Sequence, residues 1–149
     1  MSQLPHITVA TVVEHKGKFL MVREKSNDRI VYNQPAGHLE ENESLIAAAK
    51  RETLEETAWH IKVTQLLGIY QYTSEENGVS YVRHCFIAEP IEENTGSLLD
   101  EDIIEAVWLE PKTIEQKKSE LRSPLVLQAV QDYLDGVTFP LSLISQASN

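Results

Sequence analysis

The amino-acid sequence predicts a mixed β-sheet with helices packed against it, of the α+β or α/β type. Two groups of β-branched and apolar runs are separated by one segment of helical composition, and further helical segments follow the last run. This order of strands, helix, strands and helices is typical of a sheet covered by helices. Because 149 residues correspond to the size of one domain, we expect a single domain over residues 1–149.

The first part of the chain is predicted to form two strands. The run Ile7–Val13 is β-branched and almost entirely apolar, which is typical of a strand buried on both faces. A Lys-Gly turn signal separates it from Lys18–Arg23, so the two strands are expected to form a hairpin. The polar segment Ser26–Tyr32 is expected to be a loop. The next segment, Asn33–Gly37, contains a proline and a glycine and therefore cannot be a helix interior.

The middle of the chain is predicted to contain a helix and three strands. Ser44–Thr57 has three alanines, two leucines and neither glycine nor proline, which favours a helix. Two β-rich runs follow, Ile61–Tyr72 and Val79–Ala88, and the Asn-Gly pair between them is a strong hairpin signal. We expect a loop over Ile91–Leu99 and a short strand over Glu105–Leu109.

The C-terminal part is predicted to be helical. Pro111 opens a short polar helix. The last helix is marked at both ends, because Ser123 is suited to the N-cap, Pro124 to the first helical position, and Gly136 to the position just past the end.

Charge and cysteine content exclude several classes of function. The chain has 13 Lys and Arg against 23 Asp and Glu, a net charge of −10, which argues against binding to nucleic-acid polymers or anionic membranes. No apolar run approaches the roughly 18–20 residues of a membrane span. The one cysteine, Cys85, has no partner for an intramolecular disulfide, so we expect a cytoplasmic protein. An acidic protein can still bind a phosphate ester if a divalent cation lies between them.

The predicted helix carries a cluster of carboxylates. Glu52 and Glu56 are one turn apart, about 40° apart around the helix axis, and Glu55 adds a third carboxylate in the same turn. Like charges at this spacing destabilise a helix. Arg51 can pair with Glu55 at i,i+4. We expect one arginine to serve one neighbour well, which leaves Glu52 and Glu56 beside each other.

Two interpretations of this cluster remain open. Most glutamate clusters on helices are solvated faces. The apolar stripe of this helix, however, places Glu52 and Glu56 on its flank, at the edge of the packed face. Carboxylates at such a margin suit Mg²⁺, which takes one or two protein carboxylates and completes its shell with waters and phosphate oxygens. The predicted stripe consists of Ile46, Ala49, Thr53 and Thr57, widened by Leu45.

The spacing of six residues in and before this helix resembles the Nudix box of the Nudix hydrolases. The six are Gly37, Glu43, Arg51, Glu52, Glu55 and Glu56. The sequence departs from the box at three softer positions, where Thr53 replaces an aliphatic residue, Ala58 a glycine, and Trp59 an Ile, Leu or Val. Ala58 bears on helix-end geometry, because a Cβ in a left-handed conformation costs about 1–2 kcal/mol. The carboxylates of the box are all present.

This resemblance implies a fold, a reaction and a set of ligands. The implied Nudix fold is an α/β/α sandwich with a mixed β-sheet between helices, in which the box forms a loop–helix–loop. The implied reaction is hydrolysis of a phosphoanhydride with Mg²⁺, for which Mn²⁺ can substitute. The implied metal ligands are Glu52, Glu55, Glu56 and the Gly37 carbonyl, with Arg51 and Glu43 orienting the carboxylates. The implied catalytic residues are Glu52, Glu55, Glu56 and Arg51.

Segments outside the box resemble a bacterial phosphatase of the same family. They are Tyr32–Glu40, Leu121–Val126 and Phe139–Leu141. This resemblance implies an enzyme that acts on a small-molecule phosphoanhydride, and the sequence leaves open whether it is a monomer or homodimer. Its substrates would be nucleoside di- and triphosphates and small pyrophosphates, including thiamine-related ones, with orthophosphate as product. The alternatives are a diphosphatase for nucleotide sugars or dinucleotides, which yields two phosphomonoesters, and a non-catalytic ligand-sensing Nudix domain. The presence of all three box carboxylates favours an enzyme.

Four further residues are weaker candidates for the active site. Asp102 lies six residues before Trp108, where many Nudix proteins carry an acidic residue that reaches the metal; the alternative is a solvated acidic loop. Arg83 is either a phosphate contact or an outward-facing edge residue. Arg122 precedes a predicted helix N-terminus and is either an anion contact or part of the cap region. His38 is either a substrate contact or a solvated loop histidine.

Overall fold

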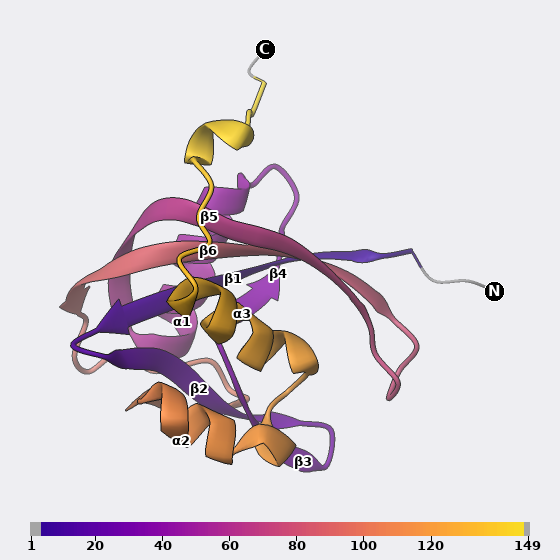
Figure 1. Cartoon of the computed structure of the whole chain (residues 1–149), viewed down its shortest axis with the longest axis vertical. Coiled ribbons are helices and arrows are strands. Elements are labelled where there is room, and N and C mark those ends of the chain that lie inside the picture. The colour runs from indigo at the N-terminus through magenta and orange to yellow at the C-terminus, as the bar shows by residue number, and fades with distance from the viewer. Residues whose placement is uncertain (1–3, 148–149) are drawn as a thin grey trace.

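The structure is a computed structural model that describes residues 4–147, so residues 1–3 and 148–149 of the predicted domain lie outside the described residues. Figure 1 shows the arrangement of the elements. The strands are β1 (His6–His15), β2 (Lys18–Ser26), β3 (Arg29–Asn33), β4 (Ala36–His38), β5 (Trp59–Thr73), β6 (Ser80–Glu93) and β7 (Ile103–Leu109). The α-helices are α1 (Leu45–Thr57), α2 (Pro111–Gln116) and α3 (Pro124–Leu134), and short 3-10 turns occupy Lys118–Glu120 and Leu141–Leu143. Within the range 4–147, no helix has the length and apolarity needed to cross a membrane.

The sheet is mixed, as the sequence predicted. Its central order is β3-β2-β1-β6-β5, with β7 paired to β2 and β4 paired to β1. β1 and β6 run parallel, from the pair His6↔Tyr81 to the pair Val13↔Ala88. The other pairings between these strands are antiparallel. β4 and the start of β6 thus pair with opposite edges of β1, and α1 contacts both β1 and β4.

The expectation of a loop over Ser26–Tyr32 was wrong. β3 begins at Arg29 and pairs with β2 across a tight turn at Asn27 and Asp28. Asn27 has φ 56°, a left-handed conformation that asparagine tolerates better than most residues. The polar composition of this stretch therefore reflects a hairpin turn and an outer strand rather than a loop. The predicted loop after the second hairpin also begins later than expected, because β6 extends to Glu93.

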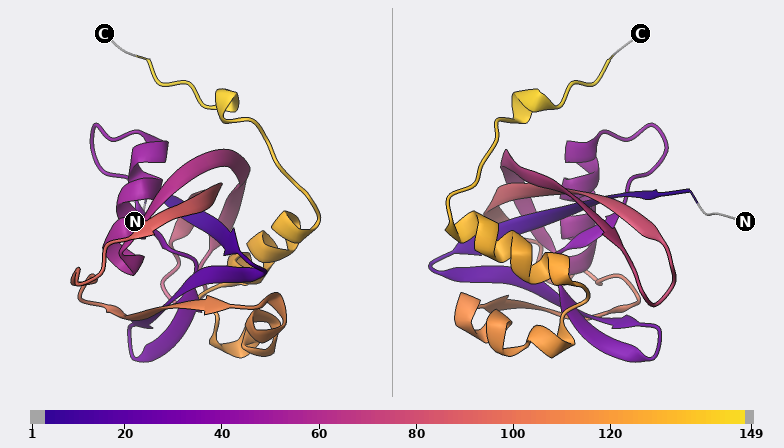
Figure 2. Two further views of the ribbon diagram at one scale, coloured as in Figure 1. Left: turned by 90° about the vertical axis from the view of Figure 1, so that its left-hand side faces the viewer. Right: turned by 45° about the vertical axis from the view of Figure 1, so that its right-hand side comes forward.

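Helices cover both faces of the sheet, which confirms the α/β/α sandwich. Figure 2 shows α1 and α3 on opposite sides of the strands. On one face, Ala48 and Ala49 of α1 pack with Val9, Leu66 and Phe86 of β1, β5 and β6. On the other face, residues of α2 and α3 pack with β1, β2, β5 and β6; they include Ile114, Val126, Ala129, Phe19, Met21, Leu67 and Cys85.

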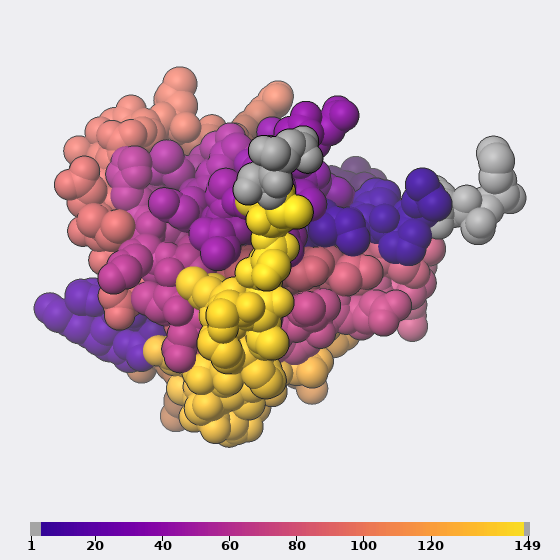
Figure 3. All heavy atoms as spheres, turned by 90° about the horizontal axis from the view of Figure 1, so that it is seen from above, coloured from indigo at the N-terminus to yellow at the C-terminus, as the bar shows by residue number. Residues whose placement is uncertain are grey.

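The chain beyond α3 crosses the edge of the sheet towards α1. Phe139 and Leu66 of β5 exchange two backbone hydrogen bonds of 2.8 and 2.9 Å. Leu141 and Ile144 then pack against the same apolar cluster as α1. Figure 3 shows this segment running over the surface of the molecule. The C-terminal segment thus closes the α1 side of the core.

Two local features fix the ends of α1. At its start, the Ser44 Oγ accepts a hydrogen bond from the Ala47 N–H (3.1 Å), which satisfies one of the free donors of the first turn. At its end, Ala58 adopts φ 65° and donates its N–H to the Leu54 carbonyl (2.9 Å). β5 begins at the next residue. α1 is therefore held between β4 and β5, with the carboxylates of its last two turns beside β4.

Candidate active site

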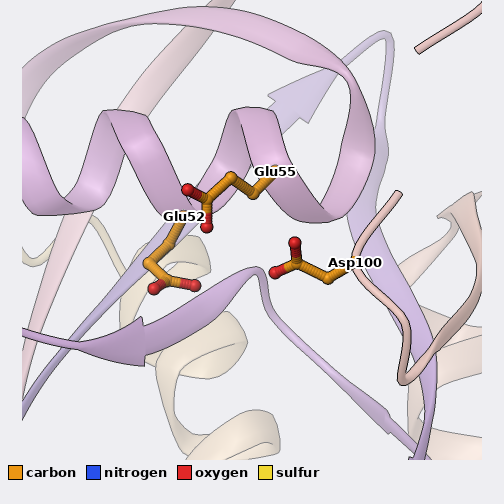
Figure 4. A group of neighbouring side chains, drawn as sticks. All are labelled: Glu52, Glu55 and Asp100. Atoms are coloured by element: carbon orange, nitrogen blue, oxygen red, sulfur yellow. The ribbon is translucent and has the colours of Figure 1, made fainter. Parts of the chain in front are cut away.

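Three carboxylates converge at one side of α1. Glu52 and Glu55 come from the helix, and Asp100 comes from the loop between β6 and β7 (Figure 4). One oxygen of each residue lies within 4.8 Å of the others. The Asp100 N–H donates to the Glu55 carbonyl (3.1 Å), so the loop is attached directly to the helix end. Carboxylate oxygens in this arrangement are the ligands that Mg²⁺ and Mn²⁺ prefer.

The acidic loop contributes Asp100 to this group, whereas the sequence had pointed to Asp102. The Asp102 carbonyl accepts a hydrogen bond from the Lys25 N–H of β2 (2.9 Å), and the residue lines an adjoining hollow with Glu56 and Asp100. Both aspartates offer the same chemistry in one acidic run. Backbone hydrogen bonds attach Asp100 to Glu55 of α1 and Asp102 to Lys25 of β2, and both bonds join residues far apart in the sequence.

Glu56 lies deeper than the margin predicted for it. Glu56 is only 7% exposed, and its Oε1 accepts a hydrogen bond from the Ala36 N–H (2.9 Å). Burial raises the pKa of Glu56 to about 9, and the charges of Glu24, Glu52 and Asp100 act in the same direction. A buried carboxylate with acidic neighbours favours the arrival of a cation.

Arg51 connects the box residues. Its Nε and Nη2 donate to the two carboxylate oxygens of Glu43 (2.6 and 2.9 Å), and its Nη1 donates to Glu52 (2.6 Å) and Glu55 (3.3 Å). Its Nη2 also donates to the His38 carbonyl (3.1 Å). The expectation that Arg51 would serve one neighbour was therefore wrong, because a guanidinium presents several donors in a fixed fork. Arg51 and Glu43 together hold Glu52 and Glu55 in place.

Gly37 lets the backbone of β4 approach the helix. A Cβ at this position would overlap the carboxyl group of Glu52. Burial raises the pKa of Glu52, while its bond to Arg51 acts in the opposite direction. The donor set therefore includes Glu52 packed directly against a glycine backbone, which fits a hard cation that takes carboxylate and carbonyl oxygens together.

A cavity of about 460 Å³ opens beside these carboxylates. Its wall includes Gly37, His38, Glu52, Glu56, Arg83 and Arg122. Arg83 is only 6% exposed on β6, which lies between β1 and β5, so it is not an outward-facing edge residue. His38 Nε2 lies 2.9 Å from His6 Nδ1, and burial lowers the pKa of His38, helped by the charges of His6 and Arg122. The structure thus brings His38, Arg83 and Arg122 to one cavity.

Arg122 is tied to a buried carboxylate that the sequence analysis missed. Its Nη1 donates to Oε1 of Glu24 on β2 (2.7 Å), and its backbone N–H donates to the Tyr32 carbonyl (2.8 Å). Glu24 lies within an ordinary strand sequence, so no motif marked it. Its burial, at 6% exposure, is what distinguishes it, and this is evident only from the structure.

Known proteins share both the sequence and the fold of this chain. A family model described as the NUDIX domain matches residues 4–129. The chain belongs to the Nudix hydrolase family. This Nudix hydrolase is 38% identical over 140 residues to the protein named Phosphatase NudJ of Escherichia coli (strain K12), a match that covers 94% of this chain and 90% of that one. Phosphatase NudJ of Shigella boydii serotype 4 (strain Sb227) gives the same values. The predicted likeness to a bacterial phosphatase of the family is confirmed.

Solved structures agree with this assignment. A NUDIX hydrolase from Nitrosomonas europaea superposes with a TM-score of 0.94 at 39% identity, covering 97% of this chain and 98% of that one. The MutT protein from Methanosarcina mazei Go1, at 19% identity and a TM-score of 0.74, shares the fold; the match covers 91% of this chain and 98% of that one. This Nudix hydrolase is therefore an enzyme that hydrolyses phosphoanhydrides.

Proposed function

We propose that this Nudix hydrolase is a metal-dependent phosphohydrolase that releases orthophosphate from nucleoside di- and triphosphates and small pyrophosphates, including thiamine-related ones. The observation that carries the proposal is the convergence of Glu52, Glu55 and Asp100 beside a cavity whose wall also contains two arginines. The product assignment follows from the likeness to proteins named Phosphatase NudJ.

The residues have distinct roles in this proposal. Mg²⁺, or Mn²⁺ in its place, would neutralise phosphate charge and lower the pKa of the attacking water when bound. Arg51 and Glu43 orient the carboxylates, and His38, Arg83 and Arg122 contact the substrate. The ligands that would hold the metal are Glu52, Glu55, Glu56, the Gly37 carbonyl and Asp100, with Asp102 beside them in the adjoining hollow.

The proposal is tested by a panel of phosphoanhydrides with Mg²⁺, with each product identified by ³¹P NMR. We expect orthophosphate and the substrate shortened by one phosphate. Two phosphomonoesters from nucleotide sugars or dinucleotides would establish the diphosphatase alternative instead. Pyrophosphate as the main product from a nucleoside triphosphate would contradict the assigned bond.

A matched pair of variants tests the role of the carboxylates. Glu52→Gln removes one ligand charge, and Glu41→Gln makes the same change at an exposed glutamate of the preceding loop. We expect turnover to be lost in the first and kept in the second. Equal turnover in both variants would leave the metal site without support.

A further inference from the structure

Arg83 is a buried cation with no carboxylate partner among the residues that the structure describes. Its Nη2 donates to two neutral amide oxygens, Oε1 of Gln34 (2.9 Å) and Oδ1 of Asn33 (3.2 Å). Its Nε is buried and has no hydrogen-bond partner among the described residues. A buried guanidinium without a counter-ion is unfavourable unless an anion reaches it. Because Arg83 lines the cavity, an anionic ligand can supply that charge.

The two amides are oriented so that their oxygens face Arg83. The Gln34 Nε2 donates to the Val126 carbonyl (2.8 Å), and the Asn33 Nδ2 makes a longer bond to Glu24 Oε1 (3.4 Å). Each amide nitrogen is thus engaged elsewhere, which leaves its oxygen for the guanidinium. The surrounding side chains therefore hold Arg83 in position without neutralising it.

Arg122 adds a second cation to the same cavity wall. The oxygen of Glu24 that Asn33 contacts also accepts the bond from Arg122 (2.7 Å). Glu24 thus pairs with Arg122 and reaches Arg83 only through Asn33, so these three charged groups together carry a net positive charge. The exposed acidic residues of the cavity wall do not cancel it, because Glu76 is paired with Arg29 (2.6 Å) and Glu40 lies 3.6 Å from Arg51.

We propose that Arg83 and Arg122 form an anion subsite that binds the phosphate remaining on the product after hydrolysis. The ligand class is a phosphate monoester dianion, whose oxygens match the donors of two guanidinium groups. The identity of this phosphate rests on the proposed function. The cavity wall then offers two carboxylates for the metal, Glu52 and Glu56, and two guanidinium groups for the remaining phosphate, Arg83 and Arg122.

This subsite defines the substrate more closely. A substrate must present two linked phosphates, one for the metal-binding carboxylates and one for the two guanidinium groups. A phosphate monoester occupies only the guanidinium groups, so it binds as a product without being cleaved.

The subsite is tested by titrating ¹⁵N-labelled protein with methyl phosphate in the presence of a chelator. Methyl phosphate is the smallest monoester and offers no base or sugar contacts. We expect saturable shifts of the Arg83 and Arg122 Nε–H signals and of the Asn33 and Gln34 side-chain amide signals. Sodium chloride at the same ionic strength should give no saturable shift.

Three variants sharpen this test. Arg122→Gln and Arg83→Lys should each raise the Kd for methyl phosphate about tenfold or more, the usual loss when a hydrogen bond to a charged group is removed. Arg23→Gln is the matched control, because Arg23 precedes Glu24 on β2 but forms an exposed ion pair with Glu105 (3.2 Å). It should leave the Kd unchanged.

Either of two results overturns the subsite. One is wild-type affinity in a folded Arg122→Gln protein. The other is the absence of saturable shifts at these four side chains in the wild-type protein, a readout that stands even if Arg83→Lys does not fold. The titration involves neither metal nor turnover. A protein that binds methyl phosphate but hydrolyses no phosphoanhydride would contradict the proposed function and keep the subsite. Orthophosphate release without methyl phosphate binding would do the reverse.

Discussion

The lack of a side chain at Gly37 allows the Glu52 carboxyl group to lie directly against the backbone of β4. The obstacle to a larger residue is the end of a flexible side chain, not backbone. Glu52 can therefore move aside without disturbing the sheet, but its carboxylate then leaves the place where Glu55 and Asp100 meet it. The fold therefore tolerates a side chain at position 37, whereas the arrangement of the three carboxylates requires glycine there.

We expect Gly37→Ala to fold and to lose most of its metal response. The added methyl group displaces the Glu52 carboxylate, so both turnover and the Mg²⁺-induced rise in Tm should fall sharply. Gly68→Ala is the control, because the nearest atoms to its Cβ would belong to the side chain of Tyr70, at 3.3 Å, and not to a carboxylate. Differential scanning calorimetry with and without Mg²⁺ makes the comparison. A Gly37→Ala protein with an unchanged Mg²⁺ response would contradict this account.

Glu56→Gln should separate catalysis from folding. A glutamine Oε1 can still accept the bond from the Ala36 N–H, but the side chain can no longer ionise to bind a cation. We expect turnover to fall by about 100-fold or more, or about 2.7 kcal/mol of transition-state stabilisation, with metal-free stability at least equal to wild type. Unchanged turnover, with a stability change below about 0.5 kcal/mol, would show that Glu56 takes no part in catalysis.

The same variant isolates a pH dependence of the metal-free protein. Burial raises the pKa of Glu56 from its usual 4.5 to about 9, so between these values the folded state holds a proton that the unfolded chain releases. The contribution of this group to stability is therefore complete at low pH and decreases as pH rises through this window. In chelator, the difference in Tm between Glu56→Gln and wild type should widen from pH 5 to pH 9, as thermal melts would show. A constant difference would contradict the raised pKa.

At the scale of elements, α1 ends on a strained residue. Ala58 holds φ 65°, where a Cβ costs about 1–2 kcal/mol. Ala58→Gly should relieve this strain but lose a buried methyl group, worth about 0.8 kcal/mol. We expect a net stabilisation of up to about 1 kcal/mol, measurable by urea denaturation, with turnover unchanged. Ala47→Gly, inside the same helix, should instead destabilise, by about 1 kcal/mol.

Local sequence predicted the elements well where it carried a local signal. The N-cap of α3 at Ser123 and the Asn-Gly hairpin before β6 are set by residues at fixed short spacings. β3 was missed because the polar residues beside it are as typical of a loop as of a hairpin turn. Asp100 was missed for a different reason, since the hydrogen bond from its N–H to Glu55 joins residues 45 apart in the chain. Such contacts depend on tertiary packing.

The site residues divide along the same line. Glu52, Glu55, Glu56 and Arg51 lie on one helix, so their spacing was readable. The partners of Arg83 come from the end of β3 and the residue after it, and composition along the chain gives no hint that they meet β6. Sequence thus predicted the carboxylates of the cavity wall and not the surroundings of its two guanidinium groups.

At the scale of the whole molecule, the proposed metal site would join three separate parts of the chain. β4 supplies Gly37, α1 supplies Glu52 and Glu55, and the loop before β7 supplies Asp100. Without a cation, the three carboxylates repel one another. With one bound, these parts are held together, so metal binding should stabilise the folded state as a whole.

We therefore expect chelation to abolish turnover and to lower Tm, and Mg²⁺ to restore both. Saturation at a hundred times the Kd corresponds to about 2.7 kcal/mol of added stability. Calorimetry against Mg²⁺ concentration measures it, with potassium chloride at equal ionic strength as control. Full activity in excess chelator would remove the metal from the mechanism.

The parallel pairing of β1 with β6 has a consequence for the order of events during synthesis. Every partner in this ladder lies 75 residues away along the chain, from His6↔Tyr81 to Val13↔Ala88. Contacts of such long range form slowly, because the intervening chain must first be closed into a loop. On the ribosome, the box helix is complete long before β6 emerges. The edge of β1 that pairs with β6 therefore stays unpaired over that interval, and unpaired strand edges favour aggregation of a nascent chain.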